Sequence, residues 1–130
     1  MSLFGLFGSK NTSEVKEERV IPWNQLTSLD QLAKIEDESK EIPVAIFKHS
    51  TRCGISRMVM NQFEKNYDID ASKMKLYYLD LLRNRDVSDE VGYKFQVMHQ
   101  SPQLLVIKNG VAVSHESHHS IEAAHLRDYI

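Results

Sequence analysis

Apolar residues along the chain fall into short continuous runs and one-sided stripes, which predict strands that alternate with helices. The run 44–47, Val-Ala-Ile-Phe, is short, partly β-branched and uninterrupted by polar residues. This is typical of a strand buried on both faces. The apolar runs 76–79 and 104–107 predict two further strands. We therefore expect a central sheet built from these segments.

Four helices are predicted around these strands from apolar stripes at helical spacing. The first runs from Ser28 to about Ser39, and the last from Ser120 to Ile130. The stripes of the two helices between them are Ile55, Met58, Val59, Phe63 and Tyr67, and then Val87, Val91 and Phe95 within 84–97.

Asn109-Gly110 joins the strand 104–107 to a further apolar run, 111–113. Asn and Gly tolerate the positive φ of a type I′ turn, so this pattern predicts a hairpin. A strand–helix–strand unit requires a parallel pair of strands, and the hairpin adds an antiparallel edge. The expected fold class is α/β, with a mixed central sheet and helices on both faces.

Residues 1–20 differ in composition from the rest and are expected to form a tail ahead of one domain, residues 21–130. The apolar patch Met1–Gly8 is too short to span a bilayer and lacks the basic region of a signal peptide. We interpret it as a frayed end. A weak docking segment for a membrane surface or a partner is the alternative.

Charge and cysteine content narrow the function classes. Lys and Arg number 16 and Asp and Glu 18, so the net charge of -2 leaves no basic field for a phosphate backbone, and we expect no nucleic-acid partner. We also expect no membrane span. Cys53 is the one cysteine, so an intramolecular disulfide is impossible and a reducing, cytoplasmic location is expected.

Cys53 lies where the strand 44–47 has ended and the next helix begins. Ligands of α/β sheets bind at the carboxyl ends of strands. The helix N-terminus supplies unsatisfied N–H groups and a partial positive charge, and Arg52 adds a full charge, so the thiolate is favoured. A buried, inert cysteine is the alternative. The apolar stripe of this helix, however, starts only at Ile55.

Pro102 provides a second indication, because it directly precedes an apolar strand. A proline in that place can enter the strand through a cis peptide bond. The backbone of Ser101 would then face outward beside the cysteine and pair with an extended disulfide partner. A trans proline that merely begins a strand is the alternative.

Together these motifs resemble the thioredoxin fold and, more closely, the YtxJ-like family of monothiol bacilliredoxins. The residues that carry the resemblance, within about 24–130, are Phe47-Lys48-His49-Ser50-Thr51, Cys53 with Ile55-Ser56, His99-Gln100-Ser101-Pro102-Gln103 and Ile107-Lys108-Asn109-Gly110. The resemblance implies that Cys53 attacks the bacillithiol sulfur of S-bacillithiolated client proteins and becomes a mixed disulfide. Bacillithiol is then a co-substrate, and no bound cofactor is expected.

Ser56 stands where a two-cysteine thioredoxin carries its second cysteine, so an external low-molecular-weight thiol must resolve Cys53. Ser56 is expected to hydrogen-bond the thiolate, or else to be a surface serine. Gly54 replaces a proline that is frequent in the family, which leaves the nucleophile in place. The expected thiol-binding and substrate-binding residues are Arg52, Gly54, Ser56, Ser101 and Pro102.

The strand 44–47 lacks the buried acid that thioredoxins usually carry, so proton transfer must be handled otherwise. His49 is a candidate base, although a polar residue at a strand end is the more ordinary interpretation. Lys48, like Arg52, is expected from its charge to bind the carboxylates of bacillithiol, with simple exposure to water as the alternative.

Two other functions are alternatives to this interpretation, and the histidines near the C-terminus raise the question of a metal site. Cys-Gly-Ile-Ser resembles the Cys-Gly-Phe-Ser of monothiol glutaredoxins, which hold iron–sulfur clusters, but the Gly-Gly pair of those proteins is missing. A non-catalytic thioredoxin-like module that binds partners through the Ser101 edge is the other alternative. No metal site is expected from the C-terminal histidines, which have no regular ligand pattern: His115, His118, His119 and His125.

Overall fold

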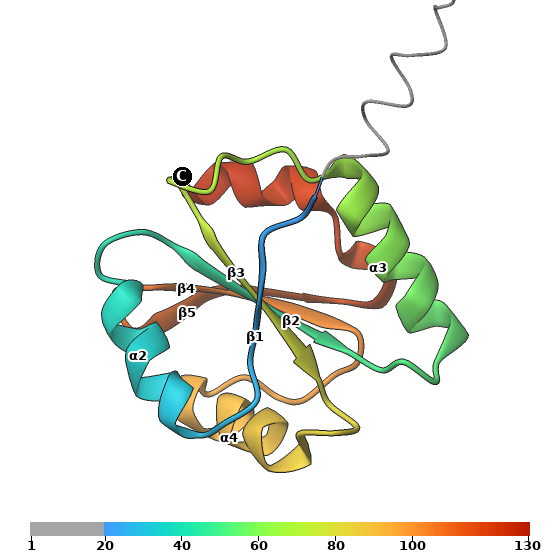
Figure 1. Ribbon diagram of the computed structural model, residues 1–130, viewed down its shortest axis with the longest axis horizontal. Coiled ribbons are helices and arrows are strands. Elements are labelled where there is room, and N and C mark those ends of the chain that lie inside the picture. The colour runs from blue at the N-terminus through green and yellow to red at the C-terminus, as the bar shows by residue number, and fades with distance from the viewer. Residues whose placement is uncertain (1–19) are drawn as a thin grey trace, which may run out of the picture.

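The computed structural model describes residues 20–130, in which a five-stranded sheet carries helices on both faces (Figure 1). The strands, in the spatial order β1-β3-β2-β4-β5, are β1 (Trp23–Gln25), β3 (Lys75–Asp80), β2 (Val44–His49), β4 (Gln103–Lys108) and β5 (Val111–Ser117). Strand β3 is parallel to β1 and β2, whereas β4 is antiparallel to β2 and β5. The predicted mixed α/β sheet is confirmed. Residues 1–19, most of the expected tail, lie outside the described part of the chain.

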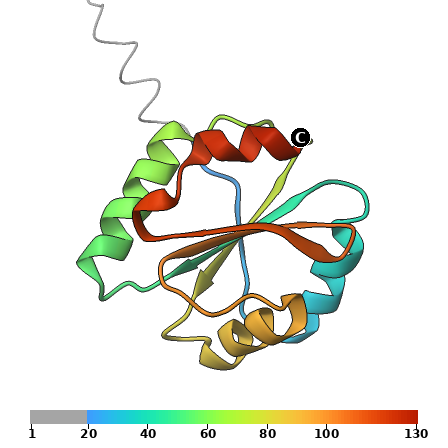
Figure 2. The same cartoon turned by 180° about the vertical axis from the view of Figure 1, so that it is seen from behind.

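Two helical layers enclose the sheet, as the views from the front and from behind show (Figures 1 and 2). Helices α2 (Asp30–Glu38) and α4 (Arg85–Phe95) cover one face, and α3 (Gly54–Asn66) covers the other together with the 3₁₀ helices η1 (His118–Ser120) and η2 (Ala123–Tyr129). All six residues of β2 are buried, because the strand is central and packed on both sides. The residues of β2 therefore alternate between the two cores.

Two elements differ from the sequence prediction. Strand β1 was missed because only three residues form it and two of them are exposed. Trp23 holds it in place, since the indole ring lies 6.1 Å from the ring of Phe47 and 5.8 Å from that of Phe63. The last helix, predicted from Ser120 to Ile130, is formed instead by 3₁₀ turns, with seven residues in η2.

Helix α3 is present as predicted, but it is rotated relative to the predicted stripe. Ile55 and Met58 are 46% and 49% exposed, whereas Ser56 is fully buried and Met60 is 6% exposed. The face that meets the sheet therefore begins with a serine, which an analysis of apolar spacing does not detect. This rotation determines how the first turn of α3 is held.

A lysine is buried in the core on the α4 side of β2. The side chain of Lys48 is fully enclosed, its Nζ donates a hydrogen bond to the carbonyl oxygen of Ser88 at 3.1 Å, and Nζ lies 3.3 Å from Nδ1 of His99. Burial lowers the pKa of Lys48 to about 8, and the carboxylate of Asp89 opposes that shift. Lys48 presents no surface to a ligand, which contradicts the expectation that it binds a carboxylate of bacillithiol.

Replacing Lys48 by methionine is expected to raise the free energy of unfolding at neutral pH by about 1–3 kcal/mol, because no ammonium is then buried. Lys48 loses its proton at lower pH in the folded protein than in the unfolded chain. The free energy of unfolding of the wild type should therefore rise by about 2 kcal/mol relative to that of the variant between about pH 8 and pH 9.5. Urea unfolding of both proteins across this range measures the difference. A difference that does not change with pH would contradict the prediction.

Gly92 allows the chain to turn tightly from α4 into the loop that precedes β4. The turn is left-handed at Gln96, with φ at 57°, and the N–H of Val97 returns to the carbonyl oxygen of Gly92 at 3.0 Å. A Cβ at position 92 would lie 2.9 Å from the carbonyl oxygen of Val97. The glycine is therefore required by a close backbone approach, despite its cost within a helix.

Gly92→Ala is expected to lower the free energy of unfolding by about 1–3 kcal/mol, because backbone must move to admit the methyl group. Urea unfolding monitored by circular dichroism measures the change. Gly54→Ala is the matched control, since a Cβ at position 54 meets nothing within 4 Å. An unchanged or increased stability of Gly92→Ala would show that the close approach of the Val97 carbonyl oxygen does not require a glycine.

Candidate functional site

Cys53 lies between the end of β2 and the beginning of α3, as the sequence predicted. The residue is the N-cap of α3, with extended backbone angles of φ -101° and ψ 124°. Its N–H donates to the carbonyl oxygen of Ser50 at 3.2 Å, and its carbonyl oxygen accepts from the N–H of Arg57 at 3.0 Å. The thiol is free and partly exposed. The sulfur is therefore carried at the positive end of a helix, where an anion is stabilised.

Arg52 and Gly54, on either side of the cysteine, are both exposed. Arg57, one turn into α3, is also exposed, and its Nη1 donates to the carbonyl oxygen of Thr51 at 3.3 Å. The Arg57 guanidinium thus lies against the segment before the helix, and Arg52 is exposed next to Cys53 in the sequence. The open surface at Gly54 leaves room for a partner. The expected substrate-binding residues Arg52 and Gly54 are accessible beside Cys53.

The peptide bond between Ser101 and Pro102 is cis, as the sequence predicted. Gln103, the first residue of β4, pairs with Lys48 of β2. The segment 99–102, which we call the cis-proline loop, therefore lies across from the last residues of β2. Pro102 is buried and Ser101 is partly exposed. Among residues 20–130, no backbone hydrogen bond uses the N–H or C=O of Ser101. The sheet register thus brings a free backbone edge to the side of the fold that carries Cys53.

Ser56 occupies a different environment from either of the expected ones. Its side chain is fully buried, its Oγ accepts the N–H of Ser50 at 3.1 Å, and Oγ lies 2.7 Å from Nδ1 of His49. The surface-serine alternative is therefore wrong. Within the described residues no hydrogen bond joins Ser56 to the sulfur of Cys53, because the rotation of α3 directs the hydroxyl toward the end of β2.

His49 ends β2 on the α3 side and is 5% exposed. Its ring lies 5.7 Å from the ring of Tyr78, and among residues 20–130 the hydrogen-bonding contact of the ring is with Ser56. Burial lowers the pKa of His49, Asp80 and Glu64 oppose the shift, and the charge of Arg57 adds to it. The imidazole is therefore neutral at pH 7, and its hydrogen-bonding partner is Ser56 rather than Cys53.

Lys48 and His49 thus extend in opposite directions from the end of β2, and each reaches one half of the site. Lys48 contacts His99, which lies two residues before Ser101 in the cis-proline loop. Burial and the charge of Lys48 lower the pKa of His99, so its ring is neutral near pH 7 and accepts from the ammonium. Neither contact of Lys48 and His49 is predicted by the apolar pattern of the sequence. Their signal was two polar residues that continue a fully buried strand.

Exposed apolar side chains are close in the sequence to the cysteine and to the cis-proline loop. Ile55 and Met58 follow Cys53 on α3, and Met98, which precedes the loop, is 82% exposed. The carbonyl oxygen of Met98 accepts from Nε2 of Gln103 at 3.0 Å, which fixes the start of the loop to β4. Clustered apolar surface is typical of a site that meets another protein.

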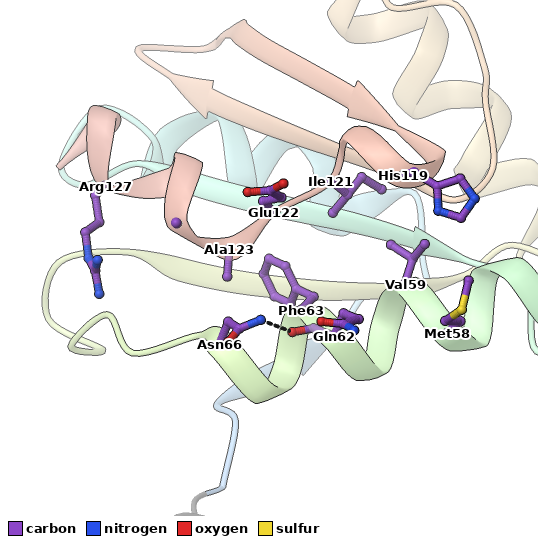
Figure 3. Close-up of a pocket in the computed structure, with 11 residues that line it drawn as sticks. Met58, Val59, Gln62, Phe63, Asn66, His119, Ile121, Glu122, Ala123 and Arg127 are labelled. Carbon is purple, nitrogen blue, oxygen red and sulfur yellow. Dashed lines mark hydrogen bonds between the residues drawn. The ribbon is translucent and has the colours of Figure 1, made fainter.

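A cavity of about 720 Å³ extends along α3 and the C-terminal 3₁₀ helices (Figure 3). Figure 3 shows Met58 and His119 at one end and Asn66 and Arg127 at the other. None of the predicted site residues lines this cavity. The N–H of His118 donates to the carbonyl oxygen of Pro102 at 3.0 Å, so η1 ties the wall of the cavity to the cis-proline loop.

The C-terminal histidines do not converge. Nδ1 of His125 contacts Oε2 of Glu116 at 2.7 Å, and His118 and His119 are exposed. Across residues 20–130 no group of three or more His, Cys, Asp or Glu side chains is placed to hold a metal ion. No helix in the same range is both long enough and apolar enough to cross a membrane.

Comparison with known proteins agrees with this geometry. The sequence family described as monothiol bacilliredoxin BrxC matches residues 24–126. A solved structure described as a candidate oxidoreductase with a thioredoxin fold matches with a TM-score of 0.69 at 33% identity, over 83% of this chain and 93% of that chain.

Thioredoxins match in fold at lower identity. The Malassezia sympodialis thioredoxin is 22% identical with a TM-score of 0.62, and the match covers 85% of this chain and 92% of that chain. The Fasciola hepatica thioredoxin is 20% identical with a TM-score of 0.58, over 81% and 93% of the two chains. The chain has the thioredoxin fold and belongs to the monothiol bacilliredoxin family.

Proposed function

We propose that the protein is a monothiol thiol–disulfide oxidoreductase that removes bacillithiol from S-bacillithiolated client proteins, with Cys53 as the nucleophile. The observation that carries the proposal is a partly exposed, solitary thiol at the N-terminus of α3, on the same side of the fold as the cis Ser101–Pro102 loop. Family membership supports a reaction with thiol-containing partners. A reducing compartment such as the cytoplasm fits a protein with one cysteine.

The reaction proceeds in two thiol–disulfide exchanges, in each of which one S–S bond breaks as another forms. In the first, the thiolate of Cys53 attacks the bacillithiol sulfur of the mixed disulfide, the old S–S bond breaks, and the client sulfur leaves as a thiolate. In the second, an external low-molecular-weight thiol attacks the bacillithiol held on Cys53. A small disulfide is released and the Cys53 thiolate is restored. The helix N-terminus stabilises the sulfur of Cys53 both as the attacking anion and as the leaving anion.

An external thiol is required because the described fold offers no internal resolving group. Ser56, at the position of a resolving cysteine, is a buried hydroxyl engaged by His49 and Ser50. A hydroxyl does not form a disulfide, so Ser56 contributes structure rather than redox chemistry. Bacillithiol is therefore proposed as a co-substrate, and the cycle needs no bound cofactor.

The surroundings of Cys53 suit a protein substrate with an anionic adduct. The unengaged backbone of Ser101 is available to pair with an extended client segment, and Ile55, Met58 and Met98 offer apolar contact. Arg52 is exposed next to the sulfur and attracts the carboxylates of bacillithiol. Gly54 leaves the approach to the sulfur open.

Reduced wild-type protein mixed with bacillithiol disulfide is expected to gain one bacillithiol per chain by intact mass, because the single thiol can accept only one. The rate should exceed that with glutathione disulfide at the same concentration. Ser56→Ala is expected to form the same adduct at a changed rate. Cys53→Ser is the control for non-covalent retention. A wild type that takes up glutathione as fast as bacillithiol, or takes up neither, would contradict the assignment.

Arg52→Glu is expected to slow this uptake by about threefold to tenfold, because the substitution reverses the charge beside the sulfur. Lys40→Glu makes the same change of charge on an exposed residue between α2 and β2, at the other end of the strand from Cys53. Lys40→Glu should leave the rate unchanged. The measurement is the second-order rate constant at low and high ionic strength. Equal effects of the two substitutions would exclude a local role for Arg52.

A further inference from the structure

A buried hydrogen-bonded group joins the residues on either side of the segment that contains Cys53. Ser56 Oγ accepts the N–H of Ser50 at 3.1 Å and meets Nδ1 of His49 at 2.7 Å. All three residues are buried. His49 is the last residue of β2, Ser50 directly follows it and Ser56 lies in the first turn of α3, so the contacts hold together the two elements that Cys53 connects. We call this group, His49, Ser50 and Ser56, the β2–α3 clamp.

We propose that His49 is a positioning residue for thiol exchange at Cys53 and that it acts through the hydroxyl of Ser56. The inference deepens the proposed function, on which it rests for the identity of the reaction. It does not require that His49 touch the sulfur or exchange a proton with it.

The hydrogen-bonding capacity of Ser56 determines how the clamp is formed. A serine hydroxyl has one proton and two acceptor lone pairs. The N–H of Ser50 occupies one lone pair, and a neutral His49 with its proton on Nε2 accepts the hydroxyl proton at Nδ1. The clamp then holds the third residue of α3 against the strand. The first turn of α3, whose N-cap is Cys53, is thereby fixed against the end of β2.

Protonation of His49 reverses this contact. Nδ1 becomes a donor, so both lone pairs of Ser56 are filled and the hydroxyl proton loses its acceptor within a buried site. The charged groups that face His49 are Asp80 at the end of β3 and Glu64 and Arg57 on α3. Because burial lowers the pKa of His49, the clamp is complete at neutral pH and is lost as the pH falls through that pKa.

The test is the pH dependence of Cys53 alkylation by iodoacetamide, which reports the reactivity of the sulfur without bacillithiol. At about pH 7.5, His49→Phe and Ser56→Ala are each expected to slow alkylation about tenfold, the effect of one buried hydrogen bond. The double variant should be no slower than either single variant, because both remove the same clamp. NMR follows the titration of His49. At pH values below that titration, the wild type and His49→Phe should be alkylated at the same rate.

Two further variants test the assignment even where His49→Phe disturbs the core. His49→Asn keeps an acceptor near the position of Nδ1 but cannot titrate. It should react close to the wild-type rate at about pH 7.5 and lack the acid-side change. His115→Asn removes an exposed histidine of β5 and should follow the wild type at every pH. Circular dichroism and urea unfolding establish that each variant is folded.

Three results would overturn the proposal: a wild-type to His49→Phe ratio that is constant with pH, additive effects in the double variant, or a His49→Asn protein as slow as His49→Phe. These outcomes are separate from the proposed function. If the alkylation rates change with the clamp as predicted but the protein does not exchange with bacillithiol disulfide, the proposed function alone is refuted. Normal exchange with bacillithiol disulfide and a pH-independent ratio would refute the role of His49 alone.

Discussion

The site depends on how β2 ends. A central strand buried on both faces must satisfy every polar group that it carries into the interior, because an unpaired buried donor or acceptor costs about 1–3 kcal/mol. Strand β2 carries two such groups at its end, Lys48 and His49. Lys48 finds its partners at Ser88 and His99, and His49 finds its partner at Ser56. The cis-proline loop and the first turn of α3 are thereby both attached to one strand, and Cys53 lies between them.

This arrangement explains how one thiol is sufficient. A thioredoxin with two cysteines completes its cycle internally, whereas here the second position is a hydroxyl that holds α3 against the sheet. In the proposed cycle, the exchange at Cys53 stops at a mixed disulfide until an outside thiol arrives. Structure and chemistry are divided between the two positions, since Cys53 is left partly exposed and Ser56 is taken into the core. Among the described residues, the backbone of Ser101 has no backbone partner within the fold, and the proposed function assigns it to a client segment.

Much of the fold could be predicted from local patterns. Continuous apolar runs identified the inner strands, and Asn109-Gly110 identified the hairpin, whose residues have φ of 53° and 80°. The position of Cys53 and the cis bond before Pro102 followed from where the runs begin and end. The contacts around Cys53 could not be predicted, because the contact between His49 and Ser56 depends on the rotation of α3 and because Lys48 meets residues far along the chain. Strand β1 was hidden for the same reason, since Trp23 packs on Phe47 and Phe63.

The most direct test of the account is the reaction of reduced protein with a molar excess of a bacillithiolated client, with the products separated and weighed by mass spectrometry. The account predicts free client thiol and bacillithiol on Cys53 in equal amounts, with no second turnover until a low-molecular-weight thiol is added. A stable disulfide between Cys53 and the client, or repeated turnover without added thiol, would contradict it.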